Sequence, residues 1–133
     1  MGHNAVTESL GAALVLLILL QIKHMVADFY LQTPMMLRNR GQYLHLGRSI
    51  HAGEHMVGSA LVLAVMGAGW SALAVIVVLE WIAHYHIDWG KGRWSDMTGH
   101  TPADAGFWRA IGFDQMLHQL TYVAMIWAWA VYG

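Results

Sequence analysis

The sequence predicts an all-α fold: one integral membrane domain, residues 1–133, whose four transmembrane helices form an up-down bundle with two amphipathic connections at the membrane surface. At 133 residues the chain is long enough for a single domain. Hydrophobic residues make up 57% of it and charged residues only 11%, less than half of the roughly 25% usual in soluble domains. The charge is too sparse for a nucleic-acid surface. The absence of cysteine excludes disulfides and thiolate metal sites.

The first predicted span covers residues 8–31. Residues 10–22 are almost wholly apolar, and Pro34 ends the helix because proline disfavours a helical conformation in the residue before it. A helix of that length spans about 36 Å, enough to cross a hydrocarbon core of about 30 Å. A signal peptide would need a positive region before the apolar run. Residues 1–9 contain no Lys or Arg, so we expect the span to be retained.

Three further spans are predicted, each near the short end of the spanning range: residues 51–66, 72–88 and 113–132. Residues 67–71 form an uncharged turn between the second and third spans, and Gly90 and Gly92 are expected to close the third. A soluble bundle would carry a charged face on each helix, which these spans lack.

The two long connections, residues 33–50 and 89–112, mix cations with large apolar side chains, as segments lying on a membrane surface do. Six of the seven Lys and Arg residues lie in these connections, and the seventh is Lys23. By the positive-inside rule, both connections face the cytoplasm of a bacterial inner membrane and both termini face the periplasm.

Each predicted span carries two metal-capable residues four positions apart. The pairs are His24 and Asp28, His51 and His55, His84 and Asp88, and Asp114 and His118. Residues four apart lie on the same face of a helix, so each pair can point at a common target. The pairs lie at the ends of spans one and three and at the starts of spans two and four. An up-down bundle therefore brings all four to the same depth, and we expect one polar cluster near the cytoplasmic face.

The three aspartates of this cluster favour a bound metal. Carboxylates and imidazoles near hydrocarbon face the bundle interior and need partners, and three carboxylates together would repel one another without a cation. Nitrogen and oxygen ligands favour one or two divalent ions, zinc first, with manganese or iron as alternatives. A metal-free network of His–Asp hydrogen bonds, which could also relay protons, remains the competing interpretation.

Several neighbours extend the predicted site. Glu80 lies one turn before His84, and Glu80 or an aspartate not used as a ligand, such as Asp28, could act as a general base. Four polar side chains near the pairs are candidates to hold an anionic group beside the metal: Lys91, Arg48, Lys23 and Gln32. His86 is two residues from His84 and points elsewhere on the helix, which leaves its role open.

These motifs, His24-x-x-x-Asp28, His51-x-x-x-His55, His84-x-x-x-Asp88-x-x-Lys91 and Asp114-x-x-x-His118, resemble a family of small bacterial and phage membrane proteins known only as a domain of unknown function. That family is in turn similar to membrane-bound, metal-dependent hydrolases with His-x-x-x-His and His-x-x-x-Asp pairs on membrane helices. The resemblance implies that the His51/His55 and His84/Asp88 pairs bind metal.

The expected function is therefore a membrane-embedded, metal-dependent hydrolase acting on a lipid, lipid-linked or phosphoester substrate at the cytoplasmic interface. Two alternatives stay open. One is a non-catalytic membrane subunit stapled by a metal or by a His–Asp network. The other is a protein that translocates metal ions or protons. The expected partners are membrane lipids, and either a homo-oligomer or membership of a larger membrane complex is compatible with each interpretation.

Overall fold

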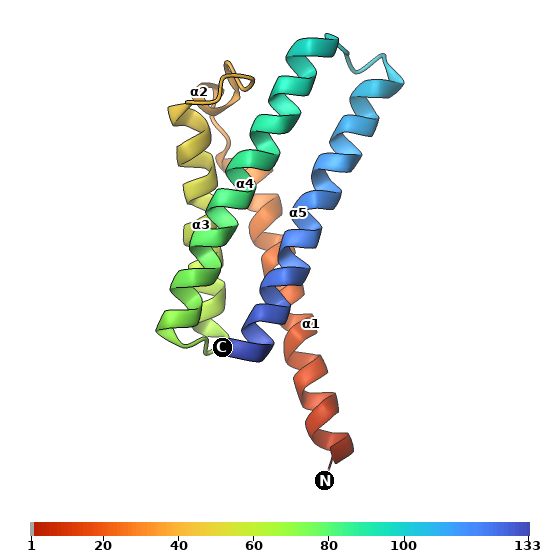
Figure 1. Cartoon of the computed structure of the whole chain (residues 1–133). Helices are drawn as coiled ribbons and strands as arrows, with labels where there is room; N and C mark the ends of the chain where they lie inside the picture. The colour runs from red at the N-terminus through yellow and green to blue at the C-terminus, as the bar shows by residue number, and fades with distance from the viewer. Residues whose placement is uncertain (1) are drawn as a thin grey trace.

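The computed structural model describes residues 2–133 and confirms the all-α prediction, with no strand in this range. The helices, in chain order, are α1 (Gly2–Val26), the π-helical turn η1 (Ala27–Leu31), α2 (Pro34–Leu37), α3 (Leu46–Val65), α4 (Trp70–Thr98) and α5 (Ala105–Tyr132). The four long helices run alternately up and down (Figure 1). The start of α1, the α3–α4 turn and the end of α5 lie at one end of the bundle. The segment carrying α2 and the α4–α5 turn lie at the other.

The first helix ends at Leu31, as predicted, and two residues separate it from Pro34. Its last turn widens into η1, and the chain then becomes extended at Gln32 and Thr33. Pro34 occupies the first position of α2, where its missing N–H leaves no helical hydrogen bond unmade. A π-helical turn is rare in proteins, but where one occurs it is often at a functional site. Here it carries Asp28.

The prediction that Gly90 and Gly92 end the third span is wrong, because α4 passes both glycines and continues to Thr98. Gly92 instead allows a close backbone contact, since a Cβ at this position would lie 2.5 Å from the carbonyl oxygen of Arg40. Likewise α5 begins well before residue 113. Most of the predicted surface connection 89–112 is therefore an extension of two long helices.

The turn that remains between α4 and α5 is short and ordered by local hydrogen bonds. Gly99 ends α4 with φ at 63°, a left-handed conformation that glycine adopts without a steric penalty. The carboxylate of Asp104 accepts hydrogen bonds from the backbone N–H (2.8 Å) and hydroxyl (2.9 Å) of Thr101. These two bonds lower the pKa of Asp104 by stabilising its charged form.

The connection between α2 and α3 folds back over the bundle through Arg48. This side chain is buried, and its guanidinium donates hydrogen bonds to the carbonyl oxygens of Gln42 (2.9 Å), Tyr43 (3.1 Å) and Arg40. The backbone N–H of Arg48 donates to His45 Nδ1 at 3.0 Å, which caps the first turn of α3. Arg48, predicted to hold an anionic group, therefore binds main-chain carbonyls of its own connection.

The bundle is polar inside and apolar outside over much of its length. Its apolar core lies toward the end with the termini and comprises Leu16, Leu20, Leu63, Ile76, Val77, Tyr122 and Met125. Large apolar side chains cover the outward faces of every long helix, for example Ile18, Ile22, Leu61, Val65, Leu79, Ile82, Leu120 and Val123. Two stretches, Val6–Leu31 and Trp70–Thr98, are long and apolar enough to cross a membrane.

The close contact at Gly92 leads to a matched pair of variants. Gly92→Ala should lower Tm, because the new Cβ would collide with backbone atoms of Arg40. Gly90→Ala, two residues earlier on the same helix, meets no atom within 4 Å. It should raise Tm, since alanine stabilises a helix by about 0.5–1 kcal/mol relative to glycine. Thermal unfolding in detergent, followed by circular dichroism, measures both; equal shifts in the two variants would contradict this packing.

Candidate metal centre

Eight imidazole and carboxylate side chains meet in the interior, and they are the eight that the sequence predicted as ligands. They come from every long helix: His24 (α1), Asp28 (η1), His51 and His55 (α3), His84 and Asp88 (α4), and Asp114 and His118 (α5). Seven of the eight are buried. Asp28 is the most accessible, with 18% of its side chain exposed.

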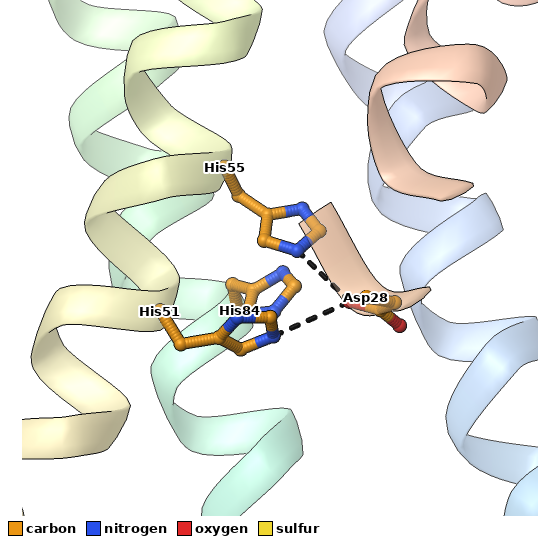
Figure 2. Close-up of side chains that lie close together, drawn as sticks. All are labelled: Asp28, His51, His55 and His84. Carbon is orange, nitrogen blue, oxygen red and sulfur yellow. Dashed lines mark hydrogen bonds and ion pairs between the residues drawn. The ribbon is translucent and has the colours of Figure 1, made fainter. Parts of the chain in front are cut away.

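One group is centred on Asp28. Figure 2 shows His51, His55 and His84 gathered around this carboxylate. Asp28 Oδ1 lies 3.0 Å from His55 Nε2 and 3.3 Å from His51 Nε2, and Asp28 Oδ2 lies 3.2 Å from His24 Nε2. Asp28, His51, His55 and His84 offer ligand atoms that all lie within 4.8 Å of one another.

A second group adjoins the first and shares His84. It consists of His84, Asp88 and His118, again with ligand atoms within 4.8 Å of one another. His84 Nε2 lies 3.6 Å from Asp88 Oδ2, and His118 Nε2 lies 3.8 Å from Asp88 Oδ1. The atoms Asp88 Oδ2, His84 Nε2 and His118 Nε2 are buried and have no hydrogen-bond partner among the described residues. Buried polar atoms without a partner (orphaned atoms) lower the free energy of unfolding, and a cation between these three would interact with all of them.

The donor set and its spacing fit a small divalent ion. Four ligands at about 2.0–2.2 Å from a tetrahedral zinc lie about 3.4 Å from one another. The distances from Asp28 to His55 and His51 already fall near this value, and those around Asp88 need only a small closure. Imidazole and carboxylate ligands accept zinc, and also manganese or iron. Either group could therefore hold an ion.

Cationic and amide side chains surround the cluster. Lys91 Nζ donates a hydrogen bond to Asp114 Oδ2 at 3.0 Å, and Gln32 Nε2 lies 3.4 Å from His51 Nε2. Two predicted anion-binding residues therefore lie directly beside the candidate ligands. Arg40, which the sequence did not single out, lies 3.7 Å from Asp88 Oδ2. It reaches this position only because the connection folds back over α4.

A second polar layer lies between the cluster and the apolar core. Lys23 Nζ donates to Glu80 Oε1 at 2.7 Å, and the Ser59 hydroxyl donates to the same oxygen at 2.8 Å. Lys23 also lies 3.2 Å from His55 Nδ1 and 3.2 Å from the Tyr122 hydroxyl. Lys23 and Glu80 are thus occupied by each other inside the bundle. The pairing with Glu80 was not predicted from the sequence; it follows because a buried ammonium needs a carboxylate partner. The prediction that Lys23 holds an anionic group stays a prediction.

The structure also places His86, whose role the sequence left open, and Tyr122, which the sequence did not single out. Tyr122 joins the two layers, since its hydroxyl lies 2.7 Å from His24 Nδ1; its position one turn after His118 is the only signal the sequence gave. His86 is exposed and lies outside the cluster. Its Nδ1 lies 2.7 Å from the Ile82 carbonyl oxygen, and its Nε2 lies 3.0 Å from the Tyr43 hydroxyl.

Comparison with known proteins identifies the family. Searches of curated proteins and of solved structures found no match. A family model described as a protein of unknown function (DUF3307) matches residues 16–132, which include all eight residues of the cluster. This match confirms the predicted resemblance to a family of unknown function. The chain belongs to the DUF3307 family.

Proposed function

We propose that this protein is a membrane-embedded, metal-dependent hydrolase whose metal is bound by the His/Asp cluster. The observation that supports it is the orphaned set of buried donor atoms at His84, Asp88 and His118, next to the His51–Asp28–His55 group. Buried titratable groups gathered at one point within a membrane-spanning bundle are more typical of functional sites than of structural cores. We propose one or two ions, zinc first.

The proposal includes four transmembrane helices rather than two. The supporting observation is that the bundle has the opposite distribution of side chains from a soluble protein. The helices α3 and α5, like α1 and α4, present apolar side chains outward, while their polar residues face inward. Six of the seven Lys and Arg residues belong to the end of the bundle with the α2 segment and the α4–α5 turn. The positive-inside rule then assigns that end to the cytoplasm of a bacterial inner membrane and both termini to the periplasm.

The roles of the cluster residues follow from its geometry. A divalent ion there would lower the pKa of a bound water toward neutrality and polarise an ester or phosphoester. The histidines and some aspartates hold the ion, and the aspartate left unused accepts a proton from the water. Asp28 suits the second role best because it is the most accessible of the three. Glu80, the other predicted base, pairs with Lys23, which in turn contacts His55. We therefore propose that Glu80 positions Lys23 rather than acting as the base.

A metal-stapled subunit without activity is the second candidate, because the cluster joins all four long helices and is almost completely buried. Translocation of ions or protons has less support. The polar layers end at the apolar core around Leu16, Leu63 and Val77, which fills the bundle toward the termini. Loss of folding on metal removal would favour the staple, and retained folding without metal would favour the hydrolase.

The orientation can be mapped with single cysteines, since the chain has none of its own. Ser71 and Thr101 are exposed at opposite ends of the bundle. A membrane-impermeant maleimide should label Ser71→Cys in spheroplasts with an intact inner membrane, and Thr101→Cys only after permeabilisation. The opposite pattern would invert the proposed topology, and labelling of both from one side would rule out a spanning bundle.

The proposed activity is tested on purified protein in detergent, with a panel of phospholipids and soluble phosphoesters. We expect turnover with zinc or manganese, and none after chelation. Asp88→Asn should lower the rate by about 100-fold or more, since changing even a residue that only orients a metal ligand typically costs about 10–100-fold. Asp96→Asn, eight residues further along α4 and exposed, should keep the wild-type rate. Full metal occupancy with no turnover on any substrate would count against the hydrolase.

A further inference from the structure

A cleft of about 880 Å³ opens between α4 and α5 at the end of the bundle that carries their connecting turn. The side chains that form its apolar walls are Ile87, Trp94, Ala110, Phe113 and Leu117. The lining residues on α5 run from Gly106 to Leu117, about 16 Å along the helix axis. Volume, length and apolar walls together suit an elongated apolar ligand.

The lining of this cleft also includes basic side chains. Lys91, Arg109 and His100 line it, and the one carboxylate among the lining residues, Asp114, is already paired with Lys91. Arg109 is exposed, and among the side chains that the structure describes, from residue 6 onward, it makes no hydrogen bond or ion pair. Its charge is therefore free to bind an anion. Arginine beside lysine is a favourable arrangement for phosphate, which accepts several charge-assisted hydrogen bonds.

The cleft also adjoins the His/Asp cluster through one residue, Asp114. Asp114 belongs both to its wall and to the cluster, where Asp114 Oδ1 lies 3.9 Å from His118 Nδ1 and is buried without a hydrogen-bond partner. An anionic group bound at Lys91 would thus lie one side chain away from the candidate ligands.

We infer that this cleft binds an anionic phospholipid, with the phosphate at Arg109 and Lys91 and an acyl chain along Ile87, Phe113 and Leu117. Free phosphate would use the cations but gain nothing from the apolar walls, whereas a zwitterionic lipid would use the walls but weaken the charge interaction. The inference rests on the proposed function in naming the substrate class of the same site. Binding itself, however, requires neither metal nor turnover.

Two pairs of variants test the inference on the whole protein in detergent. Gly90 lines the cleft and Gly112 does not, and neither has an atom within 4 Å of an added Cβ. Gly90→Phe should fill the cleft, while Gly112→Phe is its matched control. Arg109→Gln removes the free cation, and Arg93→Gln removes an exposed one outside the cleft. The arginine pair leaves buried packing untouched and keeps the test valid even if Gly90→Phe misfolds.

The readout is the Kd of phosphatidic acid, measured by native mass spectrometry on the protein as purified, with phosphatidylcholine of the same chains for comparison. Gly90→Phe should weaken binding by about tenfold. Arg109→Gln should weaken it by about fivefold, the effect of one cation near an anionic lipid. Both controls should match the wild type, and millimolar inorganic phosphate should not displace the lipid. Unchanged binding in both cleft variants, equal affinity for phosphatidylcholine, or displacement by phosphate would overturn the inference.

The outcome separates this inference from the proposed function. If lipid binding is weakened in Gly90→Phe and Arg109→Gln but no turnover is found, the lipid-binding role of the cleft would be supported and the hydrolase activity would be rejected. If soluble phosphoesters are hydrolysed in a metal-dependent way at a rate unchanged in Gly90→Phe and Arg109→Gln, the hydrolase activity would be supported and the lipid-binding role of the cleft would be rejected.

Discussion

The meeting of three carboxylates with five imidazoles inside an apolar bundle is the constraint on which the rest of the structure depends. Lys91 and Arg40 are the cations nearest to Asp114 and Asp88, at 3.0 and 3.7 Å. Lys23 is taken by Glu80. With neutral histidines, three carboxylates face two cations, so one negative charge is left without a nearby counter-ion. A divalent cation there would more than offset this single negative charge, and it would give the orphaned donor atoms a partner.

The same constraint explains the architecture around the cluster. Each long helix contributes at least one residue to the His/Asp cluster, so these residues lie at one depth in the bundle, and the apolar core lies toward the termini. The α2–α3 connection folds inward because Arg48 ties it to α3, and this brings Arg40 to Asp88. The polar interior is thereby closed on that side. It approaches the surface at Asp28 on η1 and at Asp114 beside the cleft.

Periodicity was sufficient to predict the helices and the cluster but not the contacts between segments. The spacing of four within each pair, combined with up-down connectivity, was enough to predict that His24 and His118 lie close together, although they are distant in sequence. Glycines in α4 were misread as helix ends, because sequence alone does not distinguish a glycine that breaks a helix from one such as Gly92 that admits a neighbouring backbone. The contacts of Lys23 and Arg48 were not predicted for a related reason: their partners, Glu80 and the carbonyls of the connection, are defined only by the fold.

The metal content of two adjacent histidine variants tests the central claim most directly. Purified protein should carry stoichiometric divalent metal with nitrogen and oxygen ligands at about 2.0–2.2 Å by X-ray absorption. His84→Ala should lose that metal, because His84 belongs to both candidate groups, while the exposed His86→Ala should retain it. Metal that remains equally bound in both variants, or wild-type protein that binds none after exposure to zinc, manganese and iron, would contradict the account.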